Sequence, residues 1–100
     1  MRRAIVRVES GFYRGLEWPL DRASTVIGRG TAADLVLSEA TISRAHALLA
    51  YRGDQLFVQD LGSTNGTLLN GARLTSEKQV LKNDDEIQMG RLVIGVSVPT

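Results

Sequence analysis

Apolar and polar residues alternate along several short segments of this sequence, and glycine and asparagine separate these segments at short intervals. The alternation is clearest at Ala4–Val8, Leu56–Val58 and Leu92–Val98. A period of two residues is typical of half-buried strands. Many short strands with frequent turn residues favour a β-sandwich or barrel. We therefore predict an all-β fold.

The segment between Thr31 and Ala50 allows a second interpretation. Leu35, Ile42 and Leu49 recur at heptad spacing, which would suit an amphipathic helix. The β-branched and hydroxyl residues among them disfavour a helix. We favour a strand near 35–37, a loop through Ser43 and a strand from about Ala45 to Tyr51.

Length and composition exclude several classes of protein. A chain of 100 residues supports one domain, here 1–100, which could be cut from a longer protein. A net charge of +1 argues against a dedicated nucleic-acid module, and no apolar run is long enough for membrane insertion. The chain has no cysteine and one histidine, which excludes Cys-based and His-cluster metal sites. We expect no metal and no cofactor. The lack of cysteine fits a reducing compartment.

Two patterns suggest enzymes. Gly28–Ala33 matches the dinucleotide-binding pattern G-x-G-x-x-A and would indicate a nucleotide-binding enzyme, but no helix and parallel strand follow it. Ser43 and His46 suggest a hydrolase, but in an extended segment residues three apart point to opposite faces. No G-x-S-x-G elbow is present. We predict no catalysis and interpret His46 as structural, with its ring hydrogen-bonded to backbone.

The Asn65-Gly66-Thr67 segment is a glycosylation sequon, but no signal-peptide pattern precedes it. Asn-Gly also favours a two-residue hairpin turn, because both residues accept positive φ. We therefore expect a tight turn at this position, which leaves Asn65 free for binding.

Three pieces together carry a more specific resemblance: Gly28-Arg29, Ser43-Arg44-Ala45-His46 and the run from Asp60 to Thr67. In this order and at these spacings the chain resembles the forkhead-associated (FHA) domain family over nearly its whole length. The resemblance implies a sandwich of two antiparallel sheets. It also implies loops at one end that bind phosphothreonine in an extended peptide.

The resemblance assigns phosphopeptide contacts to five residues. Arg29 and Ser43 match the phosphate-binding arginine and serine of the family, and guanidinium and hydroxyl donors suit a phosphate with three acceptor oxygens. Arg44 lies where an additional phosphate contact often occurs, and Thr64 lies where the pocket is framed. Asn65 matches the residue that hydrogen-bonds the peptide backbone, since an amide both donates and accepts.

Other residues of the pattern are expected to support the site. Gly28 allows tight backbone geometry before Arg29, His46 braces the binding loops, and Gly66 supports the turn that presents Asn65. Ser63 and Thr67 are expected in a turn and a strand. Segments 31–40, 68–75 and 82–86 are expected to be loops that select the residues around the phosphothreonine.

These assignments predict a non-catalytic, phosphothreonine-dependent binding module of Ser/Thr kinase signalling. We expect a cytoplasmic domain, monomeric in isolation, whose partner is a phosphothreonine-containing protein or peptide. The alternative is a protein-interaction domain of the same fold that binds independently of phosphate, because fold alone does not establish function.

Overall fold

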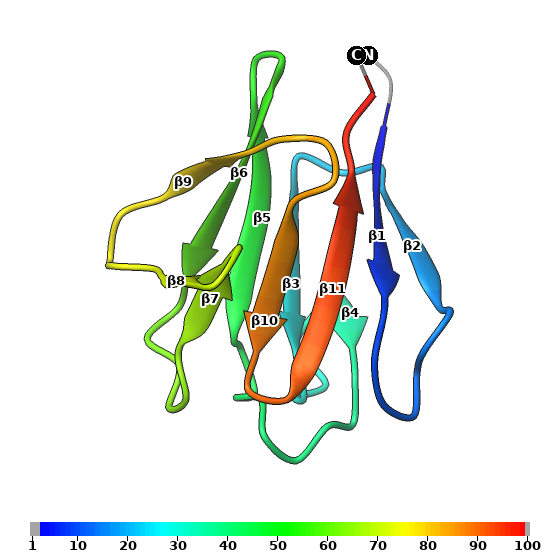
Figure 1. Ribbon diagram of the computed structural model, residues 1–100, viewed down its shortest axis with the longest axis vertical. Helices are drawn as coiled ribbons and strands as arrows, with labels where there is room; N and C mark the ends of the chain where they lie inside the picture. The colour runs from blue at the N-terminus through cyan, green and yellow to red at the C-terminus, as the bar shows by residue number, and fades with distance from the viewer. Residues whose placement is uncertain (1–2, 100) are drawn as a thin grey trace.

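The computed structural model describes residues 3–99, in which all regular secondary structure is β-strand. The strands are β1 (Ala4–Val8), β2 (Glu17–Leu20), β3 (Ser24–Gly28), β4 (Leu35–Val36), β5 (Ala47–Arg52), β6 (Gln55–Asp60), β7 (Thr67–Leu69), β8 (Ala72–Arg73), β9 (Gln79–Leu81), β10 (Glu86–Met89) and β11 (Leu92–Ser97). They form a six-stranded sheet in the order β2-β1-β11-β10-β7-β8 and a five-stranded sheet in the order β4-β3-β5-β6-β9 (Figure 1). The predicted β-sandwich is confirmed.

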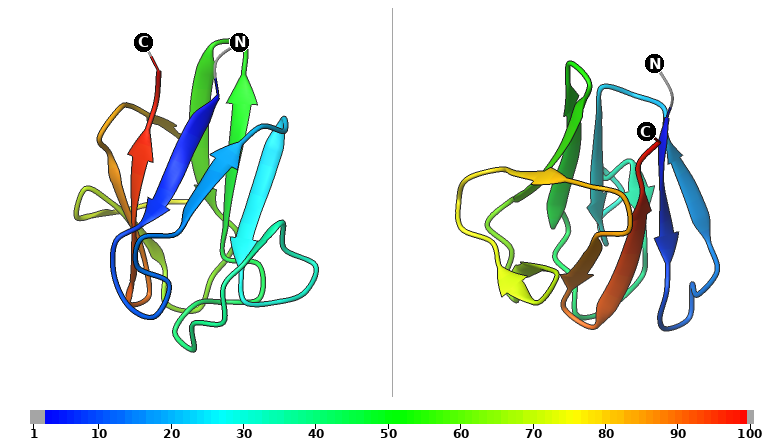
Figure 2. Two further views of the ribbon diagram at one scale, coloured as in Figure 1. Left: turned by 90° about the vertical axis from the view of Figure 1, so that its right-hand side faces the viewer. Right: turned by 45° about the horizontal axis from the view of Figure 1, so that its top comes forward.

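The predicted alternation is also confirmed. In β1 the side chains of Ala4, Val6 and Val8 are buried while those between them are exposed, and in β11 buried residues alternate with half-buried ones. The two sheets lie face to face (Figure 2, left), and their inward-facing residues form one core. Removing this apolar surface from water is the main force that holds the sheets together.

The sheets are antiparallel, as predicted, except for one parallel pair of strands at an edge. Strands β3 and β4 pair in parallel, with Ile27 opposite Leu35. The chain leaves β3 through the 29–34 loop and returns along the same edge in the same direction. The helix considered between Thr31 and Ala50 is absent, and β5 begins at Ala47, two residues later than predicted.

The two Asn-Gly pairs of the chain have different structures. The expected two-residue hairpin forms at Asn70-Gly71, where φ is +50° and +86°, and joins β7 to β8 inside a segment predicted as a loop. Asn65-Gly66 instead lies in the connection from β6 to β7, which belong to different sheets. Only Gly66 of that pair has positive φ, at +81°. The prediction of a tight hairpin turn at Asn65 is therefore wrong.

Five connections gather at the end of the sandwich opposite the chain termini: β1–β2, β3–β4, β4–β5, β6–β7 and β10–β11 (Figure 1). We call this region the loop end. It contains seven of the eight residues that the sequence singled out for binding or for support of the site, and the eighth, Gly28, is the last residue of β3.

Candidate functional site

The loop end begins with a close approach of two backbone segments. The amides of Arg29 and Gly30 donate to the carbonyls of Ser43 and Arg44, each at 3.0 Å. A Cβ on Gly28 would lie 2.0 Å from the Arg44 carbonyl oxygen. Glycine is therefore required at position 28 because the backbones touch, which supports the predicted tight geometry before Arg29.

One nitrogen of the Arg29 guanidinium forms a hydrogen bond that fixes the orientation of the group. Its Nε donates to the Ile42 carbonyl at 3.0 Å, while the residue as a whole is exposed. Among residues 3–99 the only side-chain ion pair joins Arg3 and Asp21, so no described carboxylate neutralises Arg29. The remaining donors of this guanidinium are available to an anion in a fixed orientation.

Ser43 joins two loops through its hydroxyl. The amide of Thr64 donates to Ser43 Oγ at 3.0 Å, which ties the β6–β7 connection to the β4–β5 connection. Because Oγ accepts in this bond, the hydroxyl proton can be donated elsewhere. Both residues reach the molecular surface, Thr64 more than Ser43.

His46 is fully buried and links the same two loops. Its Nδ1 accepts from the amide of Ser43 at 3.0 Å, and its Nε2 lies 2.9 Å from the carbonyl oxygen of Gly66. Since Nδ1 accepts, Nε2 carries the proton and donates. The ring therefore hydrogen-bonds backbone, as predicted. The chain between Ser43 and His46 is looped rather than extended, but the ring bonds the serine amide, and no hydrogen bond joins it to the serine hydroxyl.

Asn65 is fixed through a residue that the sequence did not single out. Its Nδ2 donates to the carbonyl of Thr41 at 2.8 Å, and Thr41 Oγ1 accepts from the amide of Arg91 at 2.8 Å. The amide and hydroxyl of Thr41 both donate to the carboxylate of Glu39. These hydrogen bonds lower the pKa of Glu39. Thr41 thus positions the exposed Asn65 amide.

Asp60 organises the chain that precedes Asn65. Its Oδ2 accepts from the amides of Gly62 and Ser63, each at 3.0 Å, and its Oδ1 accepts from the hydroxyls of Ser63 at 2.5 Å and Thr67 at 2.6 Å. Burial raises the pKa of Asp60, but the bonds from Ser63 and Thr67 outweigh it, so the pKa lies below its ordinary value. Thr67 lies in β7, as predicted, and Ser63 lies in the irregular β6–β7 connection.

These contacts connect Arg29, Ser43, Thr64 and Asn65 in one network. Arg44 contributes backbone bonds, while its exposed side chain makes no hydrogen bond to the residues that the structure describes. Sequence reasoning missed Thr41 and the role of Asp60. The role of Asp60 could have been identified from the D-x-x-S spacing of Asp60 and Ser63, which is a signal for a turn stabilised by side chains.

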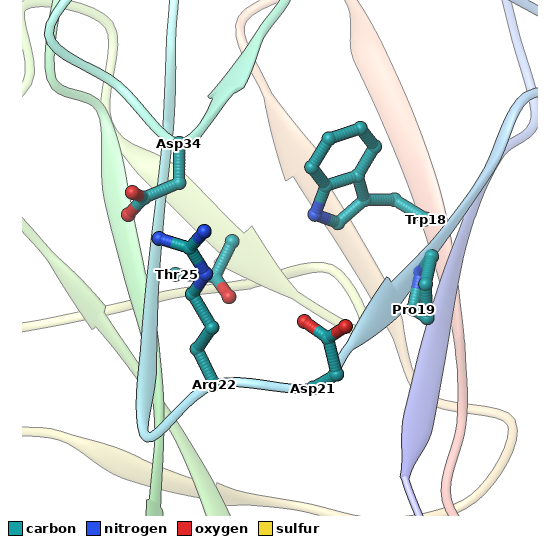
Figure 3. A pocket seen from close by; sticks show the side chains of 6 residues that line it. All are labelled: Trp18, Pro19, Asp21, Arg22, Thr25 and Asp34. Atoms are coloured by element: carbon teal, nitrogen blue, oxygen red, sulfur yellow. The ribbon is translucent and has the colours of Figure 1, made fainter.

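Other kinds of site find little support in the described part of the chain. Residues 3–99 include no cluster of three or more His, Cys, Asp or Glu side chains that could hold a metal ion. Nor do they include a helix that could span a membrane. A pocket of about 400 Å³ lies beside the β2–β3 turn (Figure 3). Trp18, Arg22 and Thr25 line it, together with Asp34 from the end of the β3–β4 connection.

Comparison with known proteins identifies the family. The model of the FHA domain matches residues 25–90, which include every predicted site residue. The chain belongs to the FHA domain family. Its sequence is 41% identical over 88 residues to the oxoglutarate dehydrogenase inhibitor of Corynebacterium jeikeium, covering 88% of this chain and 60% of the relative. The chain thus spans less than two thirds of that protein.

Solved FHA structures agree with this fold. One comes from a study of phosphothreonine-dependent FHA domain interactions and is 29% identical, with a TM-score of 0.88 over 99% of both chains. Another is EmbR of Mycobacterium tuberculosis in complex with a low-affinity phosphopeptide, at 28% identity and a TM-score of 0.87. It covers 98% of this chain and 25% of EmbR. The second neighbour shows that this domain type occurs within much longer proteins.

Proposed function

We propose that this FHA domain binds phosphothreonine in an extended peptide and that it does so without catalysis. The observation that carries the proposal is the fixed convergence of the Arg29 guanidinium, the Ser43 hydroxyl and the Asn65 amide at the loop end. Each is held by a hydrogen bond to a loop other than its own, at 2.8–3.0 Å. Donors held in place before binding lose little conformational freedom when the ligand arrives.

The available groups suit a phosphate and an adjacent peptide backbone. A phosphothreonine carries about −1.5 to −2 charges and three acceptor oxygens. Arg29 supplies charged donors and Ser43 a neutral one, with Arg44 as a further cation. Asn65 offers an amide to the peptide main chain, and Thr64 frames the pocket between Ser43 and Asn65.

The wider role we propose is regulation of a protein partner. Relatives named as an oxoglutarate dehydrogenase inhibitor and as the glycogen accumulation regulator GarA support a regulatory rather than catalytic part. We propose that residues 1–100 form one domain of a longer protein and that the isolated domain is monomeric. Phosphorylation by a kinase requires ATP, which supports a cytoplasmic setting.

The test is isothermal titration with matched peptides that carry phosphothreonine, phosphoserine, aspartate or unmodified threonine at one position. We expect a dissociation constant on the order of micromolar for phosphothreonine, about −8 kcal/mol. Phosphoserine should bind about 10-fold or more weakly, because a tight site distinguishes one methyl group by about 1–3 kcal/mol. Aspartate should bind very weakly. Equal binding of modified and unmodified threonine would instead indicate the phosphate-independent alternative.

A further inference from the structure

Arg73, which the residue pattern does not single out, lies directly beside the proposed peptide site. It is the last residue of β8, the edge strand of the six-stranded sheet, and its side chain is exposed. A Cβ placed on Gly66 would lie 2.8 Å from Nη2 and 2.9 Å from Cζ of Arg73. The guanidinium therefore fills the space where a side chain at position 66 would stand, next to Asn65.

The charge of Arg73 is not neutralised within the part of the chain that the structure describes. The one side-chain ion pair there joins Arg3 and Asp21, and no described group accepts a hydrogen bond from the Arg73 guanidinium. The carboxylates of Asp60 and Glu39, both at the loop end, are already engaged by hydroxyl and amide donors. An incoming carboxylate would meet little competition from the protein.

The hairpin that carries Arg73 is fixed in place. The Asn70 side chain donates to Asp85 at 2.9 Å and accepts from the amide of Glu86 at 2.8 Å. Beyond the turn, the amide of Leu74 donates to the carbonyl of Thr67 at 2.8 Å. A recognition group on a rigid element is positioned more accurately than one on a free loop.

We propose that Arg73 selects phosphothreonine peptides that carry aspartate or glutamate close to the phosphothreonine, where the peptide passes Asn65 and Gly66. This inference rests on the proposed function. An extended peptide advances about 3.3 Å per residue, so a side chain within about three residues of the phosphothreonine can reach the guanidinium. A planar guanidinium and a carboxylate form two parallel hydrogen bonds, which lysine cannot reproduce.

The experiment measures dissociation constants for phosphothreonine peptides with alanine at all flanking positions except one, which carries aspartate, alanine or lysine. The scan covers four positions on each side. We expect one position at which aspartate binds about fivefold more tightly than alanine, as a well-oriented exposed ion pair allows. Arg73→Gln should reduce this ratio to about one, and Arg73→Glu should make lysine the preferred residue at the same position. Arg52→Gln, which removes the same charge from the β5–β6 hairpin at the opposite end, should leave the ratio intact.

The outcomes separate this inference from the function on which it rests. If the unmodified domain binds no phosphothreonine peptide, the proposed function fails. If the domain binds and Arg29→Ala abolishes binding, but aspartate is preferred at no position, the inference alone fails. The inference also fails if Arg73→Gln weakens the binding of the aspartate peptide and of the alanine peptide equally, since Arg73 would then only support Gly66. Inversion of the preference by Arg73→Glu would establish direct contact.

Discussion

The loop end and the pocket beside the β2–β3 turn both combine arginine, acidic and hydroxyl side chains, yet they are built differently. At the loop end, side chains bond to backbone groups far away in sequence, as from Arg29 to Ile42, from His46 to Gly66 and from Asn65 to Thr41. The pocket is lined mainly by residues close together on β2, β3 and the turn between them (Figure 3).

This difference shows why the pocket is the weaker candidate for anion binding. A phosphate needs several donors that converge and keep their orientation, and a hollow does not supply these by itself. The pocket has one arginine, Arg22, beside the carboxylates of Asp21 and Asp34. At the loop end the carboxylates of Glu39 and Asp60 accept bonds from amide and hydroxyl donors, and no described carboxylate forms an ion pair with Arg29 or Arg44. The orientation of donors therefore indicates the site better than the size of a cavity.

The largest effect on peptide affinity is expected when Arg29 at the loop end is replaced, and Arg22 of the pocket serves as the comparison. Arg29→Ala should weaken phosphothreonine binding by about 2–5 kcal/mol, since a charge-assisted contact in a desolvated site is lost. The melting temperature should change little, because Arg29 is exposed. Arg22→Ala should leave affinity unchanged. Isothermal titration of both variants tests the comparison, and a loss of affinity in the Arg22 variant would contradict it.

The second prediction compares two side chains that each hydrogen-bond two backbone groups, the buried His46 and the half-buried Tyr51. His46→Ala should lower the free energy of unfolding by about 3 kcal/mol, because the Ser43 amide and the Gly66 carbonyl lose their partner. It should also weaken peptide binding. Tyr51, whose hydroxyl accepts from Ala4 and donates to Leu20, provides the matched case away from the loop end.

Tyr51→Phe should lower stability by about 1–2 kcal/mol and leave affinity unchanged. Thermal melts combined with titration separate the two effects. If His46→Ala leaves the melting curve unaltered and only abolishes binding, the histidine contacts the ligand rather than bracing the loops.

The sequence predicted the sandwich well, because the alternation of buried and exposed residues is a local signal. Alternation at Ala4–Val8 and at Leu92–Val98 identifies inward and outward faces without knowledge of the partner strand. The parallel pairing of β3 with β4 could not be predicted, since it depends on where the 29–34 loop returns. The two Asn-Gly pairs could not be distinguished for the same reason. Only the pair whose flanking strands lie side by side in one sheet forms a hairpin, and that pairing is not visible in the local sequence.

Connections between distant residues were missed for a similar reason. Thr41 joins Asn65 and Arg91, which lie 24 and 50 residues further along the chain. Arg73 lies against Gly66 only because the β7–β8 hairpin folds back. Asp60 is the exception, because its partners are two, three and seven residues away and its role was accessible to sequence reasoning.

The third prediction concerns the contribution of Asp60 to the stability of the fold and how this contribution changes with pH. Its pKa in the folded protein lies below the unfolded value of about 3.9, so its stabilisation is present above that pH and is lost as pH falls through the folded-state pKa. Asp60→Asn should lower the free energy of unfolding by about 1–2 kcal/mol at neutral pH, because an amide cannot accept all four hydrogen bonds that the carboxylate accepts.

The stability difference between the original domain and Asp60→Asn should shrink as the solution is acidified below about pH 4. Urea unfolding at several pH values measures it. A constant difference from pH 7 to pH 2 would mean that the ionised carboxylate of Asp60 contributes nothing to the fold.

The smallest expected effect is at the ion pair near the β2–β3 turn. Arg3 and Asp21 are 3.5 Å apart, and their side chains are 61% and 50% exposed. Water and salt screen such a pair, and ordering two exposed side chains offsets most of the attraction. Asp21→Asn should therefore change the free energy of unfolding by less than about 0.5 kcal/mol and leave peptide affinity unchanged. Asp60→Asn makes the same chemical change where the carboxylate accepts four hydrogen bonds, so the ratio of the two losses measures how much the loop end depends on its internal bonds. Equal losses in urea unfolding at pH 7 would show that the two regions do not differ in this respect.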